Sequence, residues 1–219
     1  MKRHKNVKKT VSLLMTGVMA LVLCSCGKDE KAFEISKTAY DNINLAYESV
    51  EAIGSDVYEA WRLGIYEKDE MSIELLASEL SLSEDDITKG IASVLVTVGV
   101  SESAEEVDSA IVDKIFSLLE DDMFSLCVEI VKEAYVANGT VEEIKGHLDE
   151  AKAQMKELSE DYSDYEHYPN LKGYYTTTSS FFDFCQNPTG SFEQVKTTIN
   201  DYKNEARNYI NDLNYIFED

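Results

Sequence analysis

The chain has few of the residues that carry catalytic and metal chemistry. It contains 3 His, 4 Cys, 2 Pro and 1 Trp among 219 residues. No HExxH, CxxC, GxSxG, P-loop or GxGxxG pattern occurs anywhere in it. These absences remove the usual signatures of zinc enzymes, serine hydrolases and nucleotide-binding proteins. The sequence therefore predicts no catalytic activity, no cofactor and no metal site.

Basic residues are also scarce, since 20 Lys and Arg stand against 42 Asp and Glu, for a formal net charge of −22. Nucleic-acid binding needs Lys and Arg to neutralise phosphates, so we expect no nucleic-acid partner. The acidic excess also disfavours lying flat on anionic lipid. Hydrophobic residues make up 44% of the chain and aromatic residues 10%, too much for a disordered polymer, so a folded domain is expected.

No apolar run is long enough to span a bilayer, which takes about 20 residues in a helix. The longest such segment, Val11–Leu23, has 13 residues and includes Ser12, Thr16 and Gly17. Five basic residues and no acid precede it: Lys2, Arg3, Lys5, Lys8 and Lys9. A basic segment followed by a short apolar core is typical of a signal peptide for export.

The residues after this core, Leu23-Cys24-Ser25-Cys26, resemble the lipobox of bacterial lipoproteins. That motif has an aliphatic residue three positions before the cysteine and a small residue immediately before it. Cys26 fits better than Cys24, because Ser25 is small and Leu23 is bulky. The resemblance implies cleavage after Ser25 and a diacylglyceryl group on Cys26, which would anchor the protein stably in a membrane. An ordinary signal peptide with incidental cysteines is the alternative.

These features divide the chain into a signal peptide (1–25), a short tether (26–30) and an acidic helical domain (31–219). Removing residues 1–25 leaves 194 residues, enough for one self-sufficient core, and lowers the formal net charge to about −27. Among the 20 basic residues only Arg3, Arg62 and Arg207 are arginines, a bias that suggests an AT-rich, Gram-positive host. We expect an extracytoplasmic protein anchored to the cell membrane.

Helical periodicity dominates the remainder, with apolar residues three or four positions apart. It predicts an all-α, single-domain antiparallel bundle of about six helices with long N- and C-terminal helices. The expected ranges are 31–66, 72–80, 84–98, 103–136, a helix from Thr140 to about 165, and one from Ser191 to the C-terminus. The alternating valines at 94, 96, 98 and 100 could form a strand, but the segment also fits a buried helix. Capping boxes are expected at Ser103, Thr140 and Ser191, with helix breaks at Asn138-Gly139, Pro169 and Pro188.

Two cysteines remain besides those of the lipobox, and no metal cluster is evident. Cys127 lies among apolar residues, where a buried thiol is expected, although a disulfide with Cys185 is possible outside the cell. Carboxylates share one helical face at Glu157, Glu160, Asp161 and Asp164. This face could hold calcium or a basic partner, but a solvated surface is the simpler interpretation, since no EF-hand loop is present.

An aromatic segment is the strongest functional indication. Residues 162–184 contain eight Tyr and Phe residues beside a run of Thr and Ser. Tyrosine combines an apolar ring with a polar tip, so Tyr174, Tyr175 and Phe181 could line a groove for a glycan or peptide. We therefore expect a lipid-anchored surface protein with a non-catalytic binding or scaffolding role toward an unknown surface protein, peptide or glycan. The alternative is a small-ligand receptor that uses this segment.

Overall fold

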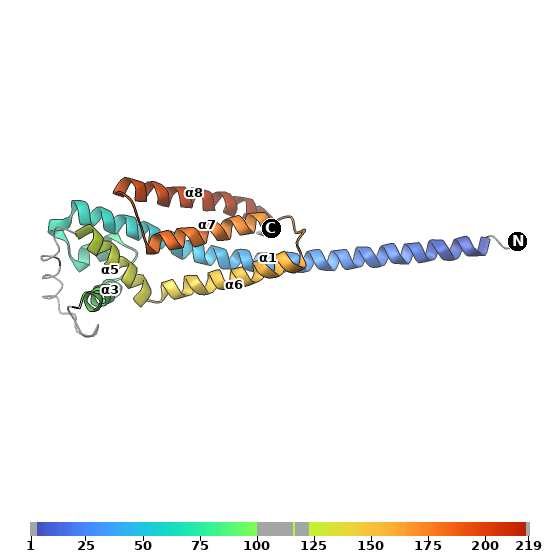
Figure 1. Ribbon diagram of the computed structural model, residues 1–219, viewed down its shortest axis with the longest axis horizontal. Coiled ribbons are helices and arrows are strands. Elements are labelled where there is room, and N and C mark those ends of the chain that lie inside the picture. The colour runs from blue at the N-terminus through green and yellow to red at the C-terminus, as the bar shows by residue number, and fades with distance from the viewer. Residues whose placement is uncertain (1–3, 100–115, 117–122, 218–219) are drawn as a thin grey trace.

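The chain is all-α, as its periodicity predicts (Figure 1). A computed structural model describes the backbone of residues 4–99, 116 and 123–217, and the side chains of these from residue 29 onward. Within those residues there are seven α-helices, one short 3-10 helix and no strand. The elements are α1 (His4–Tyr66), η1 (Lys68–Glu70), α2 (Ile73–Glu79), α3 (Glu84–Thr97), α5 (Met123–Ala137), α6 (Thr140–Asp161), α7 (Tyr168–Gln186) and α8 (Phe192–Phe217).

Helix α1 is the element on which the others pack, since it contacts α5, α6, α7 and α8. Its buried side chains recur every three or four residues from Ala32 to Leu63, the spacing that keeps one side of a helix in the core. The helix ends at Tyr66, as predicted, but it begins at His4 and not near residue 31. Ile65, near the end of this helix, is exposed although its position continues the apolar spacing.

Specific side-chain contacts fix the direction of α7 and α8 relative to α1. Tyr174 of α7 lies beside Tyr40 and Tyr47 of α1, and the Cys185 Sγ lies 4.0 Å from the Val50 carbonyl oxygen. Helices α7 and α1 therefore run in the same direction.

Helix α8 runs in the opposite direction to α1, because later residues of α8 contact earlier residues of α1. From the end of α8 backward, Asn214 accepts a hydrogen bond from Tyr40, Arg207 pairs with Glu51, Lys203 donates to Ser55, and Lys196 lies over Tyr58.

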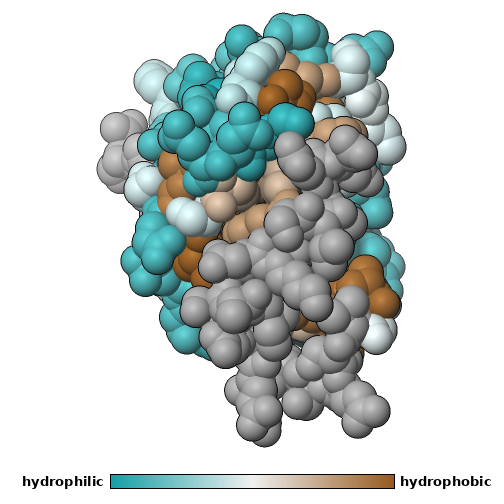
Figure 2. Space-filling model, turned by 90° about the vertical axis from the view of Figure 1, so that its left-hand side faces the viewer, coloured by the Kyte–Doolittle hydropathy of each residue, from teal (hydrophilic) through white to brown (hydrophobic). Residues whose placement is uncertain are grey.

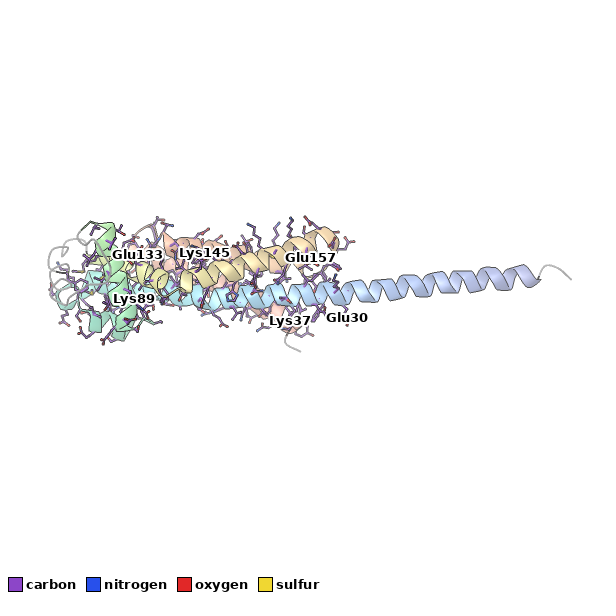
Figure 3. The ribbon with its side chains drawn as sticks, turned by 90° about the horizontal axis from the view of Figure 1, so that it is seen from below. Glu30, Lys37, Lys89, Glu133, Lys145 and Glu157 are labelled. Carbon is purple, nitrogen blue, oxygen red and sulfur yellow. The ribbon has the colours of Figure 1, made fainter. Side chains whose placement is uncertain are left out.

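The body formed by these helices has two distinct ends (Figure 1). Figure 3 shows Glu30 and Lys37 of α1 and Glu157 of α6 at the end nearer the N-terminus, while Lys89 and Glu133 mark the opposite end. The C-terminal end of α8 lies at the first of these, which we call the proximal end. The shorter helices α2 and α3 lie at the other, the distal end.

Several local predictions are confirmed. Helices α2 and α3 cover the expected ranges within one residue. Of the alternating valines, Val94 and Val96 lie in α3, Val98 is its C-cap and Val100 lies outside the described residues. Val96 and Val98 are exposed, so this end of the helix is not buried as expected. Ser191 and Gln194 form the expected capping box: the Ser191 N–H donates to Gln194 Oε1 at 2.8 Å, and the Gln194 N–H donates to Ser191 Oγ at 3.4 Å. Pro169 lies in the first turn of α7, where a missing N–H costs nothing.

Of two further local predictions, one is wrong and the other lies partly outside the described residues. The Thr140 capping box is wrong: Gly139, with φ of 88°, is the N-cap of α6, and the Thr140 N–H donates to the Asn138 side chain at 3.1 Å. Only glycine adopts such a φ without strain, so the Asn138-Gly139 break itself sets the start of the helix. The helix expected over 103–136 is described only from Met123, so its capping box at Ser103 lies outside the described residues.

Two glycines inside helices differ in what surrounds them. A Cβ at Gly90 of α3 would overlap the Ile130 carbonyl oxygen of α5, so the two helices touch through their backbones there. A Cβ at Gly146 of α6 would meet nothing within 4 Å. The first glycine is required by packing, whereas the second only weakens its helix.

Substituting these two positions should therefore change stability in opposite directions. We expect Gly90→Ala to lower the free energy of unfolding by about 1–3 kcal/mol through overpacking. Gly146→Ala should raise it by up to about 1 kcal/mol through helix propensity. Urea unfolding followed by circular dichroism measures both, and a neutral or stabilising Gly90→Ala would contradict the close packing of α3 on α5.

Candidate functional site

The three residues predicted to line a ligand groove do not form an exposed surface. Tyr174 and Phe181 are each 0% exposed, so the expectation of exposed rings is wrong for both. Tyr174 donates a hydrogen bond to Asn44 Oδ1 at 3.1 Å, and the Phe181 ring stacks on Tyr202 of α8. Tyr175 is half-buried against the core. The buried rings of α7 thus pack against α1 and α8.

The lipobox residues belong to α1, whose helix runs unbroken through 26–30, the predicted tether. The side chains of Leu23, Cys24, Ser25 and Cys26 lie outside the described ones. Among the described side chains, Ala32 is the first that is buried. Cys26 is thus followed after only six residues by the packed part of the same helix.

Cys127 and Cys185 are both free and buried. The Cys127 Sγ lies 3.7 Å from Met71 Sδ, and burial raises the pKa of its thiol to about 12. Burial also raises the pKa of the Cys185 thiol. The expected buried thiol at Cys127 is confirmed, and the alternative of a Cys127–Cys185 disulfide is not what the structure has. Neither thiol is suited to nucleophilic chemistry, which needs the thiolate.

The four acidic residues Glu157, Glu160, Asp161 and Asp164 are all exposed. They do not share one helical face as predicted, because α6 ends at Asp161 rather than near residue 165 and Asp164 lies beyond it. In the part of the chain that the structure describes, no three His, Cys, Asp or Glu residues are placed to hold a metal ion. His147 instead hydrogen-bonds Asn42 at 3.0 Å, between α6 and α1. Of the described helices, none is long and apolar enough to cross a membrane.

A polar cleft of about 390 Å³ lies between α1, α2 and α8. Its lining comes from four residues of α1, two at or just after the end of α2, and four of α8: Ser55, Asp56, Tyr58, Glu59, Glu79, Ser81, Lys196, Ile199, Asn200 and Lys203. This volume falls within the range of small-ligand sites. We call it the α1–α8 cleft.

Asp56, which lines this cleft, is only 3% exposed. Its Oδ2 accepts hydrogen bonds from the Ser81 backbone N–H at 2.9 Å and from the Tyr135 hydroxyl at 2.7 Å. Burial raises the pKa of Asp56 more than these two hydrogen bonds lower it. A carboxyl group with a raised pKa in a cleft is a feature of active sites. Here its partners join α1 to α5 and to the turn after α2, so its role is structural.

The two sides of the cleft carry opposite charge. On the α8 side, Lys203 donates to Ser55 at 2.8 Å, and the Lys196 Nζ lies 5.9 Å from the centre of the Tyr58 ring. On the other side, Glu59 and Glu79 share the guanidinium of Arg62 at 2.5 and 3.8 Å. The α8 side is therefore basic, and the side formed by α1 and α2 is acidic.

Sequence reasoning missed this cleft, because its residues lie in three distant segments and match no motif. One signal was available: Lys196, Asn200 and Lys203 have the spacing of a single helical face. In a chain so poor in basic residues, two lysines on one face could have been noticed. Their acidic counterparts on α1 and α2 could not, since only the fold brings them opposite.

A smaller cleft of about 290 Å³ lies where α7 leads into α8, beside the stacked rings of Trp61 and Phe124. Trp61 is 9% exposed, so it is largely a core residue. Figure 2 views the molecule from its distal end, where hydrophobic residues show between hydrophilic ones. This cleft has fewer charged residues than the α1–α8 cleft, and its two charged residues, Glu129 and Lys132, pair with each other at 2.8 Å.

Comparison with protein-family models, curated proteins and solved structures found no match to this chain.

The raised pKa of Asp56 predicts a pH dependence of stability. Because the folded pKa exceeds the unfolded one, the ionised carboxylate destabilises the fold at neutral pH, and this cost disappears as pH falls toward 4. Asp56→Asn cannot ionise, so its thermal midpoint relative to the wild type should be higher at pH 7.5 than at pH 4.5. Differential scanning calorimetry at both values measures this, and the exposed Asp201→Asn serves as control. A difference that does not change with pH would contradict the burial of an ionisable Asp56.

Proposed function

We propose that this chain is a lipid-anchored, extracytoplasmic protein with a non-catalytic binding or scaffolding role. The observation that carries the proposal is the lipobox-like sequence Leu23–Cys26 behind a basic and then apolar N-terminus. Acylation of Cys26 would hold the protein on the outer face of the cell membrane, in keeping with the Gram-positive composition bias. Its large negative charge supports a body that stands away from anionic lipid.

The course of α1 supports a fixed posture on the membrane. From Cys26 to Ala32 a helix advances about 9 Å, so the packed body begins close to the lipid. Because α1 is continuous from Cys26 into the body, no irregular segment would separate the lipid from the packed helices. We propose that the proximal end faces the membrane and that the distal end, with α2 and α3, projects outward.

The finer architecture that we propose is an antiparallel bundle. The reversed order of contacts between α1 and α8 supports it, as does the contact of Gly173 in α7 with the Tyr209 ring of α8. Loops of a few residues between α6, α7 and α8 favour neighbours of opposite direction. Such a body suits a spacer or platform.

The small-ligand receptor remains a second candidate, but at a different place. The α1–α8 cleft favours it, because this cleft has the volume and the convergent polar groups of a ligand site. The aromatic segment 162–184 no longer supports it, since two of its three key rings are buried.

The anchor is tested by labelling cells with an alkyne fatty acid. Cys26→Ala should abolish incorporation and shift the protein from the membrane fraction to the soluble one, because its thiol is the attachment point. Cys24→Ala, its matched control, should retain both the label and the membrane fraction. Loss of label in Cys24→Ala with retention in Cys26→Ala would move the anchor to Cys24. If both variants keep the fatty-acid label, the proposal of a lipid anchor is contradicted.

The binding role is tested by chemical crosslinking on intact cells. We expect the full chain to recover at least one protein partner or surface polymer reproducibly, because a scaffold acts only through what it holds. An unrelated lipoprotein of similar abundance controls for chance encounters. Recovery of nothing beyond that control would argue strongly against scaffolding.

A further inference from the structure

We propose that the α1–α8 cleft binds a small zwitterion of the amino-acid or dipeptide class, with one free carboxylate and one free ammonium group. This inference deepens the proposed binding role but is independent of the lipid anchor. It rests on the two oppositely charged sides of the cleft, which a ligand with a single charge would match only in part.

The basic side has a lysine available for a ligand carboxylate. Lys196 is exposed and has no ion pair with any described residue, and its ammonium group lies over the Tyr58 ring. Lys203 is less free, because it donates to Ser55 at 2.8 Å and lies 3.7 Å from Glu51. Its side chain is only 17% exposed and therefore fixed in position. Lys203 thus contributes a fixed positive charge, whereas the exposed Lys196 side chain can change its rotamer to bind the ligand carboxylate.

On the acidic side the carboxylates of Glu59 and Glu79 share one guanidinium, that of Arg62. Arg62 is also shared by Glu67 at 3.6 Å, which lies beyond the cleft lining. The carboxyl of Asp56 also lines the cleft, but it is buried and bonded to Ser81 and Tyr135, so Glu59 and Glu79 are the carboxylates that a ligand would meet. An ammonium group placed here would gain charge-assisted hydrogen bonds to carboxylates that Arg62 alone does not satisfy.

Size and selectivity follow from the same geometry. About 390 Å³ accommodates an amino acid or a dipeptide but not a folded partner. A purely anionic ligand would meet the carboxylates of Glu59 and Glu79, and a purely cationic ligand would meet Lys196 and Lys203. Repulsion from the opposite side should disfavour both.

Isothermal titration calorimetry of the full chain in detergent tests the proposal with three matched probes. These are Ala-Ala with free ends, N-acetyl-Ala-Ala, which lacks the ammonium, and Ala-Ala-amide, which lacks the carboxylate. We expect Ala-Ala to bind and each blocked probe to bind at least about tenfold more weakly, since each loses one charged contact. No binding of Ala-Ala at millimolar concentration, or equal binding of any blocked probe, would overturn the proposal.

A pair of variants places the binding site. Lys196→Gln should weaken Ala-Ala binding about tenfold or more without altering the fold, because this side chain is exposed. Lys152→Gln removes one charge from an exposed position on α6, away from the cleft, and should bind like the wild type. Unchanged binding in Lys196→Gln, or an equal loss in Lys152→Gln, would overturn the assignment to this cleft. Neither result alters Cys26 acylation, so this proposal and the anchor fail separately.

Discussion

Burial of α1 is the constraint on which the rest of the structure depends. Helices α5, α6, α7 and α8 all cover it, and its fully buried side chains include Ile43, Ile53 and Leu63. Each such side chain stabilises the fold by about 1.5–3 kcal/mol relative to exposure. An apolar stripe running through the middle of a molecule leaves little freedom in where the other helices lie. They must cover it along its length, and this sets the elongated body seen in Figure 1.

The same helix links packing to the proposed location. If Cys26 is acylated, the residue that enters the lipid and the residues that organise the core belong to one rigid element. A flexible stalk would uncouple the body from the membrane, whereas a continuous helix passes on its orientation. In the proposed orientation, repulsion between the acidic body and anionic headgroups would favour an upright body over one lying on the membrane.

The polar side chains of this body are of two kinds: some are buried and bonded within the fold, and others are exposed and could bind a ligand. Asp56 is occupied, since it joins α1 to Tyr135 of α5 and to the backbone of Ser81. Cys127 and Cys185 are buried as neutral thiols. Lys196 differs, because it is exposed in the α1–α8 cleft opposite carboxylates that share one arginine. This contrast makes binding at the cleft a better proposal than catalysis at Asp56.

The sequence by itself determined the all-α class, the end of the first long helix at Tyr66, the helices at 73–79 and 84–97, and the capping box at Ser191. These depend on apolar spacing and on side chains within four residues of one another, which a sequence displays directly. Tertiary structure alone decided that Tyr174 and Phe181 are buried and that Lys196 and Lys203 line one cleft with Glu59 and Glu79. Which side of an aromatic helix is covered, and which charges meet across a cleft, depends on helices distant in sequence, and local periodicity carries no information about them.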